Sequence, residues 1–349
     1  MPKMPPMMTP LLSVIIPSRN ERWLARTVQD ILANARGETE VIAVCDACWP
    51  DPPLQDHPRL TVVHYTDAIG QRAATNQGVR LSRAKYVMKL DGHTAVDEGF
   101  DVKLAEPYED GRLRWDCTTI PRLYNLHVYD WECQGCKWRT YQGRKPETCP
   151  TCKGTVFEMS EVWKPRMDRR TDYARFDSEL HFQYWIRYER EHRDEQKKDL
   201  SDVMSSVGNA FFMRRDWFRK FGCLDEQTGF WGQFGTEVSC RSWLGGGRQV
   251  VNKTTWYSHY FRVNGAGFPY EISGNDQERA RQYSQAYWRG NRWAGQKRPL
   301  SWLVDKFWPV PGWSEEARSA LKTPGENGTR SSRSAPAGQG EQDASLAHT

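Results

Sequence analysis

The chain has 349 residues, 38% of them hydrophobic, which is enough to bury a substantial core and excludes an unfolded polar chain. Its 49 basic and 44 acidic residues give a formal net charge of +5, a small excess that suits an anionic partner such as a nucleotide sugar or DNA. No segment approaches the ~18 apolar residues of a membrane span, and residues 1–10 lack the apolar run of a signal peptide, so we expect a cytoplasmic protein.

Short strands alternate with amphipathic helices in the first hundred residues. This order is typical of βαβ units and predicts an α/β fold around a mostly parallel sheet. The first helix is expected to begin near Asn20, to end at Gly37 and to cover the sheet with its apolar face. The four predicted strands are residues 11–16, 40–44, 60–64 and 85–90.

The rest of the chain divides by composition. Residues 131–157, rich in Cys, Gly, Lys, Pro and Thr, indicate a small inserted module. Residues 317–349 have too few large apolar side chains to order themselves, and we expect a disordered tail there. Residues 1–10 are expected to be flexible and residues 11–310 to form one domain. Within that domain the sequence predicts helices at 180–195, 237–244 and 275–293 and a strand at 249–255.

Asp91 and His93 follow the fourth predicted strand, with a carboxylate and an imidazole two residues apart. Ligands of open α/β sheets bind at the carboxyl ends of the strands, so both side chains can face a site and bind a divalent cation. The tripeptide alone leaves a second interpretation open. In that interpretation Asp91 caps the following turn and His93 is an exposed loop histidine.

Motifs occur in one order along residues 11–263. They are Ser13-Val14-Ile15-Ile16-Pro17 with Arg19-Asn20-Glu21, Gly70 to Gly78, Asp91 with His93, Gly208-Asn209-Ala210-Phe211-Phe212, Phe230-Trp231-Gly232, and His259-Tyr260-Phe261-Arg262. In this order they resemble family 2 glycosyltransferases and, most closely, the polypeptide N-acetylgalactosaminyltransferases, whose metal motif is DxH. The resemblance implies the GT-A fold, the Rossmann-like fold of nucleotide-diphospho-sugar transferases, and a nucleotide-diphosphate sugar donor, with UDP favoured.

The resemblance also implies a metal site and a donor site. His259 matches the family's third metal ligand, so Asp91, His93 and His259 are expected to hold Mn²⁺ or Mg²⁺ against the charge of the leaving diphosphate. Imidazole ligands favour Mn²⁺. Asp91 and His93 are thereby candidate catalytic residues. The candidate donor-binding residues are Pro17, Asn20, Glu21, Asp46, Arg72 and Arg262.

Two of these donor-site residues have alternative roles. Asp46 resembles the carboxylate that contacts the uracil or the ribose, but an aspartate before Pro50 can equally form a turn. Arg72, like Arg262, can assist at the phosphates, or it can be a surface arginine of a helix.

Two departures from the family pattern affect the site. The second strand usually carries two adjacent acids, whereas here Cys45 precedes Asp46. The acceptor-side motif usually carries a glutamate where this chain has Phe234. Glu237 is then either a displaced general base, and a third candidate catalytic residue, or an acid in the first turn of a helix. The closer relatives are retaining enzymes, but retention or inversion stays open here.

Four of the nine cysteines, Cys133, Cys136, Cys149 and Cys152, form a C-x₂-C-x₁₂-C-x₂-C pattern. Four thiolates at this spacing predict a closed, structural Zn²⁺ site, a zinc ribbon that organises an insertion too small to build its own core. The ribbon either staples a loop or presents the basic and aromatic residues between its cysteine pairs to nucleic acid.

The leading hypothesis is therefore a metal-dependent glycosyltransferase that uses a UDP-sugar. The alternative is a nucleic-acid-binding zinc-ribbon protein with a degenerate transferase core. A combined hypothesis makes a hydroxylated base in DNA the acceptor, in which case the base has to be single-stranded or flipped to reach the metal. Protein side chains, cell-surface glycans and lipid-linked sugars are the other open acceptors, and the missing membrane span disfavours the lipids.

Overall fold

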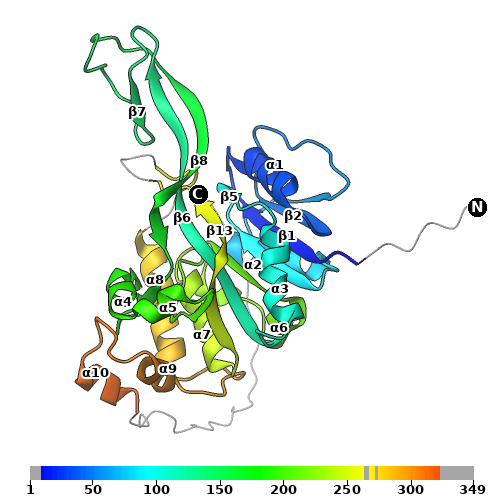
Figure 1. Ribbon diagram of the computed structural model, residues 1–349, viewed down its shortest axis with the longest axis vertical. Coiled ribbons are helices and arrows are strands. Elements are labelled where there is room, and N and C mark those ends of the chain that lie inside the picture. The colour runs from blue at the N-terminus through cyan, green and yellow to red at the C-terminus, as the bar shows by residue number, and fades with distance from the viewer. Residues whose placement is uncertain (1–8, 263–266, 272–273, 323–349) are drawn as a thin grey trace, which may run out of the picture.

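The computed structural model describes residues 9–262, 267–271 and 274–322. An 11-stranded mixed sheet forms its centre, with the strand order β11-β13-β6-β12-β4-β1-β2-β3 (Figure 1). The first four strands pair in parallel, which confirms the predicted βαβ half of the fold. Their bounds are Leu12–Ser18 for β1, Thr39–Asp46 for β2, Leu60–Tyr65 for β3 and Tyr86–Leu90 for β4.

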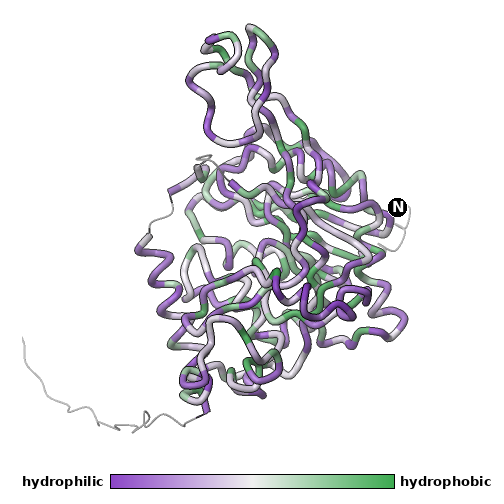
Figure 2. Tube along the Cα trace, turned by 60° about the vertical axis from the view of Figure 1, so that its left-hand side comes forward, coloured by the Kyte–Doolittle hydropathy of each residue, from purple (hydrophilic) through white to green (hydrophobic). Residues whose placement is uncertain are grey.

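Helices cover both faces of the parallel half because successive strand residues point to opposite sides of a sheet. Val14 and Ile16 pack with α1 and α3 on one face, while Ile15 packs with α2 and α7 on the other. Hydrophobic residues accordingly run through the strands inside the body (Figure 2). These helices are α1 (Leu24–Asn34), α2 (Gly70–Leu81), α3 (Phe100–Glu109) and α7 (Phe234–Leu244).

The other half of the sheet is mixed and carries the later part of the chain. β12 runs antiparallel to β4 and β6, whereas β13 runs parallel to β6. The short strands β5 and β11 both pair with β13. The bounds are Thr94–Val96 for β5, Cys117–Cys133 for β6, Leu200–Asp202 for β11, Ala210–Arg214 for β12 and Arg248–His259 for β13.

A long hairpin projects from this half of the sheet (Figure 1). It consists of β6 and β8 (Phe157–Thr171), paired antiparallel, and of the short strand β7 (Arg139–Tyr141). We name residues 125–170 of this hairpin the arm. The predicted insertion at 131–157 is only the tip of the arm, because the pairing of β6 with β8 already begins at Leu123.

Aromatic side chains fix the root of the arm to the body. Trp23 stacks on Tyr129 at 6.1 Å between ring centroids and packs against Trp163 at 5.9 Å. The Trp163 indole donates a hydrogen bond to Asp30 of α1 at 3.0 Å. Tyr260 belongs to the same buried cluster. We name Trp23, Tyr129, Trp163 and Tyr260 the root cluster.

Two secondary-structure predictions need correction. The helix predicted at 180–195 is a strand and two short helices, because Leu180 has a left-handed backbone (φ 58°) and β10 then pairs with β9. Within the tail expected to be disordered, residues 317–320 belong to helix α10, which Ser314 caps, while residues 323–349, like 1–8, lie outside the described residues. The remaining bounds are Ala174–Phe176 for β9, Phe182–Tyr184 for β10, Ile186–Glu191 for α4, Arg193–Lys197 for α5, Arg215–Lys220 for α6, Gly274–Arg289 for α8, Leu300–Lys306 for α9 and Glu315–Ala320 for α10. Within the described part of the chain, no helix is long and apolar enough to cross a membrane.

Candidate functional site

Asp91, His93 and His259 meet beyond the carboxyl end of β4. The chain turns after Asp91 into β5, whose pairing with β13 sets Thr94 opposite His259 and so brings His93 alongside it. The Nε2 atoms of the two histidines are 3.0 Å apart, and His259 Nε2 lies 3.0 Å from Asp91 Oδ2. One ligand atom from each residue lies within 4.8 Å of the others, so the three can share one cation.

Glu21 orients His93. Its Oε2 lies 2.8 Å from His93 Nδ1 and accepts a hydrogen bond from the Arg262 guanidinium at 2.5 Å. Burial would raise the pKa of Glu21, but His93 and Arg262 outweigh it and lower the pKa to about 2. A carboxylate at Nδ1 holds the imidazole proton there and leaves the Nε2 lone pair of His93 for a metal.

Asp91 is held as an anion and His259 as a neutral base. Burial would raise the pKa of Asp91, but the contacting Lys89 ammonium and the neighbouring histidines lower it. Burial lowers the pKa of His259 to about 4, against the opposing effect of Asp91. One carboxylate and two neutral imidazoles form a donor set that fits Mn²⁺.

A cavity of about 1090 Å³ lies over these residues. It exceeds the roughly 300–1,000 Å³ of most small-molecule sites, so it has room for a ligand as large as a nucleotide sugar. Asn20, Arg72 and Glu237 do not line it. The predicted site residues that do line it are Pro17, Glu21, Asp46, Asp91, His93, His259 and Arg262.

Asp46 and Asn20 shape the rim of the cavity through backbone contacts. Asp46 caps α2, since its two carboxylate oxygens accept the N–H groups of Ile69 at 2.6 Å and Gly70 at 3.1 Å. Asn20 has a left-handed backbone (φ 51°), and its amide donates to the Pro269 carbonyl at 2.7 Å. Asn20 therefore acts on the cavity by holding the segment around Pro269, and not by lining it.

The structure contradicts both roles predicted for Arg72 and favours one of the two predicted for Glu237. Both are almost fully buried and joined by an ion pair of 2.7 Å, and Glu237 also pairs with Arg241 at 2.9 Å. The other guanidinium nitrogens of Arg72 donate to the carbonyls of Gly229 and Gly232. Arg72 is thus neither a phosphate contact nor a surface arginine, and Glu237 is an acid in the first turn of α7 with its carboxylate fully engaged.

Sequence reasoning missed Lys89 and Gln71, which both reach Asp91. The Gln71 amide donates to Asp91 Oδ1 at 3.2 Å, and the Lys89 ammonium contacts the same oxygen. Lys89 also lies 4.7 Å from the centre of the Phe234 ring. A lysine inside an otherwise apolar, fully buried strand was the available signal, since lysines are rarely buried without a partner.

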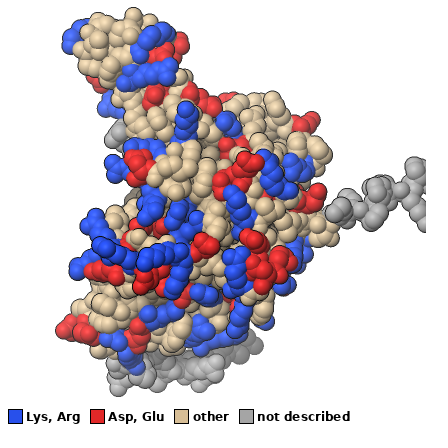
Figure 3. Space-filling view, viewed as in Figure 1, with Lys and Arg blue, Asp and Glu red and all other residues tan. Residues whose placement is uncertain are grey.

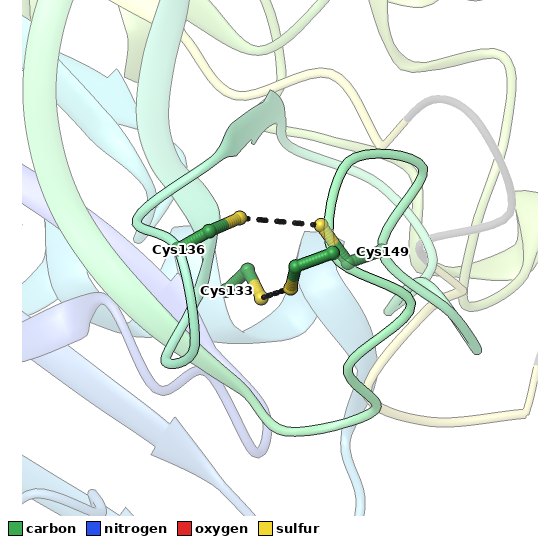
Figure 4. Close-up of side chains that lie close together, drawn as sticks. Cys133, Cys136 and Cys149 are labelled. Atoms are coloured by element: carbon green, nitrogen blue, oxygen red, sulfur yellow. Dashed lines mark hydrogen bonds between the residues drawn. The ribbon is translucent and has the colours of Figure 1, made fainter.

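The four cysteines of the predicted ribbon come together at the tip of the arm. The sulfur atoms of Cys133 and Cys152 lie 3.5 Å apart and those of Cys136 and Cys149 lie 3.6 Å apart (Figure 4). All four sulfurs lie within 4.8 Å of one another. The two turns have the same form, since in each the backbone N–H of the residue four positions after the first cysteine donates to that cysteine's carbonyl: Lys137 donates to Cys133 and Lys153 to Cys149. The arrangement fits a tetrahedral metal site with no open position.

Comparison with known proteins places the chain in a family. The model of glycosyl transferase family 2 matches residues 13–222, well over half of the chain. The chain belongs to glycosyl transferase family 2. Its fold is the GT-A fold, which a crystal structure of GalNAc-T7 with UDP, GalNAc and Mn²⁺ shares with a TM-score of 0.54 at 15% identity, over 90% of this chain and 54% of that one.

Curated relatives include two polypeptide N-acetylgalactosaminyltransferases. Number 6 of Bos taurus is 25% identical over 269 residues, which is 73% of this chain and 38% of that protein. Number 5 of Caenorhabditis elegans is 24% identical over 267 residues, which is 72% of this chain and 37% of that protein. The chain thus spans about two fifths of the length of the curated relatives it matches.

Proposed function

We propose that the protein is a divalent-metal-dependent glycosyltransferase that takes its sugar from a nucleoside diphosphate, with a UDP-sugar favoured. The observation that carries the proposal is the meeting of Asp91 and His93, from the turn between β4 and β5, with His259, from the end of β13, in a cavity of nucleotide-sugar size. Membership of the family and the UDP and Mn²⁺ in the related GalNAc-T7 structure support it.

The chain's own residues divide the work of the site. Bound Mn²⁺ would supply positive charge to the leaving diphosphate. Asp91, His93 and His259 would hold the ion, and Glu21 orients His93. Arg262 lies 3.4 Å from His93 Nε2 and lines the same cavity, so we assign it to the phosphates. Pro17 and Asp46, which also line the cavity, complete the proposed donor contacts.

Calorimetric titration of UDP with and without Mn²⁺ tests this proposal. We expect Mn²⁺-dependent binding that Asp91→Asn and His259→Ala both abolish. The matched controls are Asp56→Asn and His57→Ala, whose side chains lie outside the cavity and which should bind UDP like the original chain. Failure of the original chain to bind UDP or any other nucleoside diphosphate would contradict the proposal.

We also propose that Cys133, Cys136, Cys149 and Cys152 hold a structural Zn²⁺. The four sulfurs leave no position for a substrate, and none of these cysteines lines the cavity. The described tip has only a small apolar cluster around Phe157, so the metal would supply the order that packing does not. This supports the role of a staple for the arm.

A further inference from the structure

Exposed apolar side chains gather at the candidate site. Of the eleven large hydrophobic side chains that are exposed in the described part of the chain, four line the cavity over Asp91. They are Tyr184, Ile186, Phe230 and Phe268, which we name the apolar rim. Exposed aromatic rings beside a ligand cavity provide flat surfaces on which other rings can stack.

Basic side chains line a surface pocket beside the same cavity. Arg170 lines both this cavity and a neighbouring surface pocket of about 530 Å³. That pocket lies against α4 and α5, where Lys and Arg side chains gather on the surface (Figure 3). We name Arg170, Arg190, Arg193 and Lys197 the basic ridge, since all four are exposed and line this pocket.

Two cations of the basic ridge have no acidic partner among the described residues. Arg170 lies 3.6 Å from Glu189, and Lys197 lies 3.1 Å from Asp194. Within residues 9–262, 267–271 and 274–322, no acidic side chain pairs with Arg190 or Arg193. Their guanidinium groups are therefore available to an external anion, and guanidinium groups bind phosphate in two parallel hydrogen bonds.

We propose that the acceptor is a single strand of nucleic acid, with its bases stacked on the apolar rim and its phosphates along the basic ridge. This inference rests on the proposed glycosyltransferase function, because it places the acceptor in the same cavity. A neutral glycan or an uncharged peptide would use the rings but not the free arginines. A nucleic acid strand presents a flat ring and a phosphate in every residue and so uses both surfaces.

The donor supplies both the sugar and the leaving group for the transfer. The hydroxyl oxygen of a hydroxylated base in the strand forms the new bond to the anomeric carbon as the bond from that carbon to the diphosphate breaks, and the hydroxyl proton leaves with the nucleoside diphosphate. An unpaired strand suits this chemistry because a base that is stacked and paired inside a duplex has to be flipped out before it can enter the cavity.

Fluorescence anisotropy of the full chain with a labelled single-stranded DNA of about 16 nucleotides tests the proposal. Binding should weaken between roughly 50 and 200 mM salt. The double variant Arg190→Ala/Arg193→Ala should lower the slope of log affinity against log salt by about 1.4, or about 0.7 for each lost phosphate contact. Tyr184→Ala and Phe230→Ala should each weaken binding about tenfold at an unchanged slope. The control Arg80→Ala/Arg83→Ala removes two exposed arginines that line neither pocket and should change neither quantity.

The outcomes separate the two proposals. Mn²⁺-dependent UDP binding without DNA binding overturns the acceptor proposal alone. DNA binding without binding of any nucleoside diphosphate overturns the proposed function and, with it, the role of the strand as acceptor. If polyphosphate displaces the labelled strand as effectively as unlabelled DNA of equal charge, the aromatic rings do not contribute to binding. That outcome overturns the acceptor proposal. If Lys145→Ala/Lys153→Ala loses DNA binding while Arg190→Ala/Arg193→Ala binds DNA fully, the strand lies on the arm. That outcome overturns the acceptor proposal as well.

Discussion

Glu21 touches His93 and Arg262 but none of the other metal ligands, so its effect on a metal has to pass through His93. Without the carboxylate, the His93 ring loses the partner that fixes its proton at Nδ1. We expect Glu21→Ala to lower Mn²⁺ affinity about 10- to 100-fold, measured as free Mn²⁺ by electron paramagnetic resonance. Glu147→Ala, at an exposed position near the tip of the arm, is the control. Unchanged affinity in Glu21→Ala would rule out this orienting role.

Glu237 holds two buried guanidinium groups, those of Arg72 and Arg241. Glu237→Gln removes the negative charge and leaves both cations uncompensated in the core. We expect the free energy of unfolding to fall by about 3–5 kcal/mol, measured by urea denaturation. Below the unfolding transition, UDP binding should persist. A loss of transfer without a loss of stability would restore the catalytic role for Glu237 that the buried ion pairs argue against.

Asp91 and His93 could be proposed as metal ligands from their position after a predicted strand, whereas His259 could be proposed only from the family resemblance. Glu237 could not be assigned in this way. Its partner Arg72 lies 165 residues away, and the mutual neutralisation of the two charges exists only in the folded core. The role of Lys89 was missed for a similar reason, since its partner Asp91 is only two residues away but its burial depends on the neighbouring strands.

At the scale of the element, the tip of the arm depends on its four cysteines. We expect Cys136→Ser, or a strong chelator, to remove one equivalent of zinc and to open the segment 134–156 to limited proteolysis. Cys48→Ser, outside the cluster, should keep the zinc and the protease resistance. The β6–β8 stem and UDP binding should survive in both variants, because the root cluster holds the stem. An original chain that contains no zinc would contradict the proposed site.

The parallel strands were predictable because runs of β-branched residues with both faces buried read as continuous apolar segments. β6 and β8 were not. They carry many polar residues, and their length is set by pairing with each other, which composition does not record. The segment after Leu180 has helix-forming residues, but the left-handed turn at Leu180 and pairing with β9 override that local preference.

At the scale of the molecule, the tip should be separable from the body. Cys133 and Phe157 face each other in the β6–β8 ladder, so an Asn-Gly turn between them can close the hairpin without residues 134–156. We expect this shortened chain to fold with a lowered unfolding midpoint, as measured by circular dichroism, because Val128 and Tyr129 lose the hydrogen bonds that they donate to Gln142 and Gly143. It should also bind UDP and Mn²⁺ as before. Loss of that binding would show that the tip contributes to the donor site.

The arm contacts the body through the root cluster, which is the point about which it can tilt. From Tyr129 in the root cluster to Cys133, β6 spans roughly 13 Å at about 3.3 Å per residue, so a tilt of about 10° at the root moves Cys133 by about 2 Å. Tyr260 of the root cluster donates its N–H to the His93 carbonyl at 3.1 Å. The tilt of the arm and the position of the proposed metal ligand His93 therefore depend on the same cluster of side chains. A displacement of the tip would move His93 by a smaller distance.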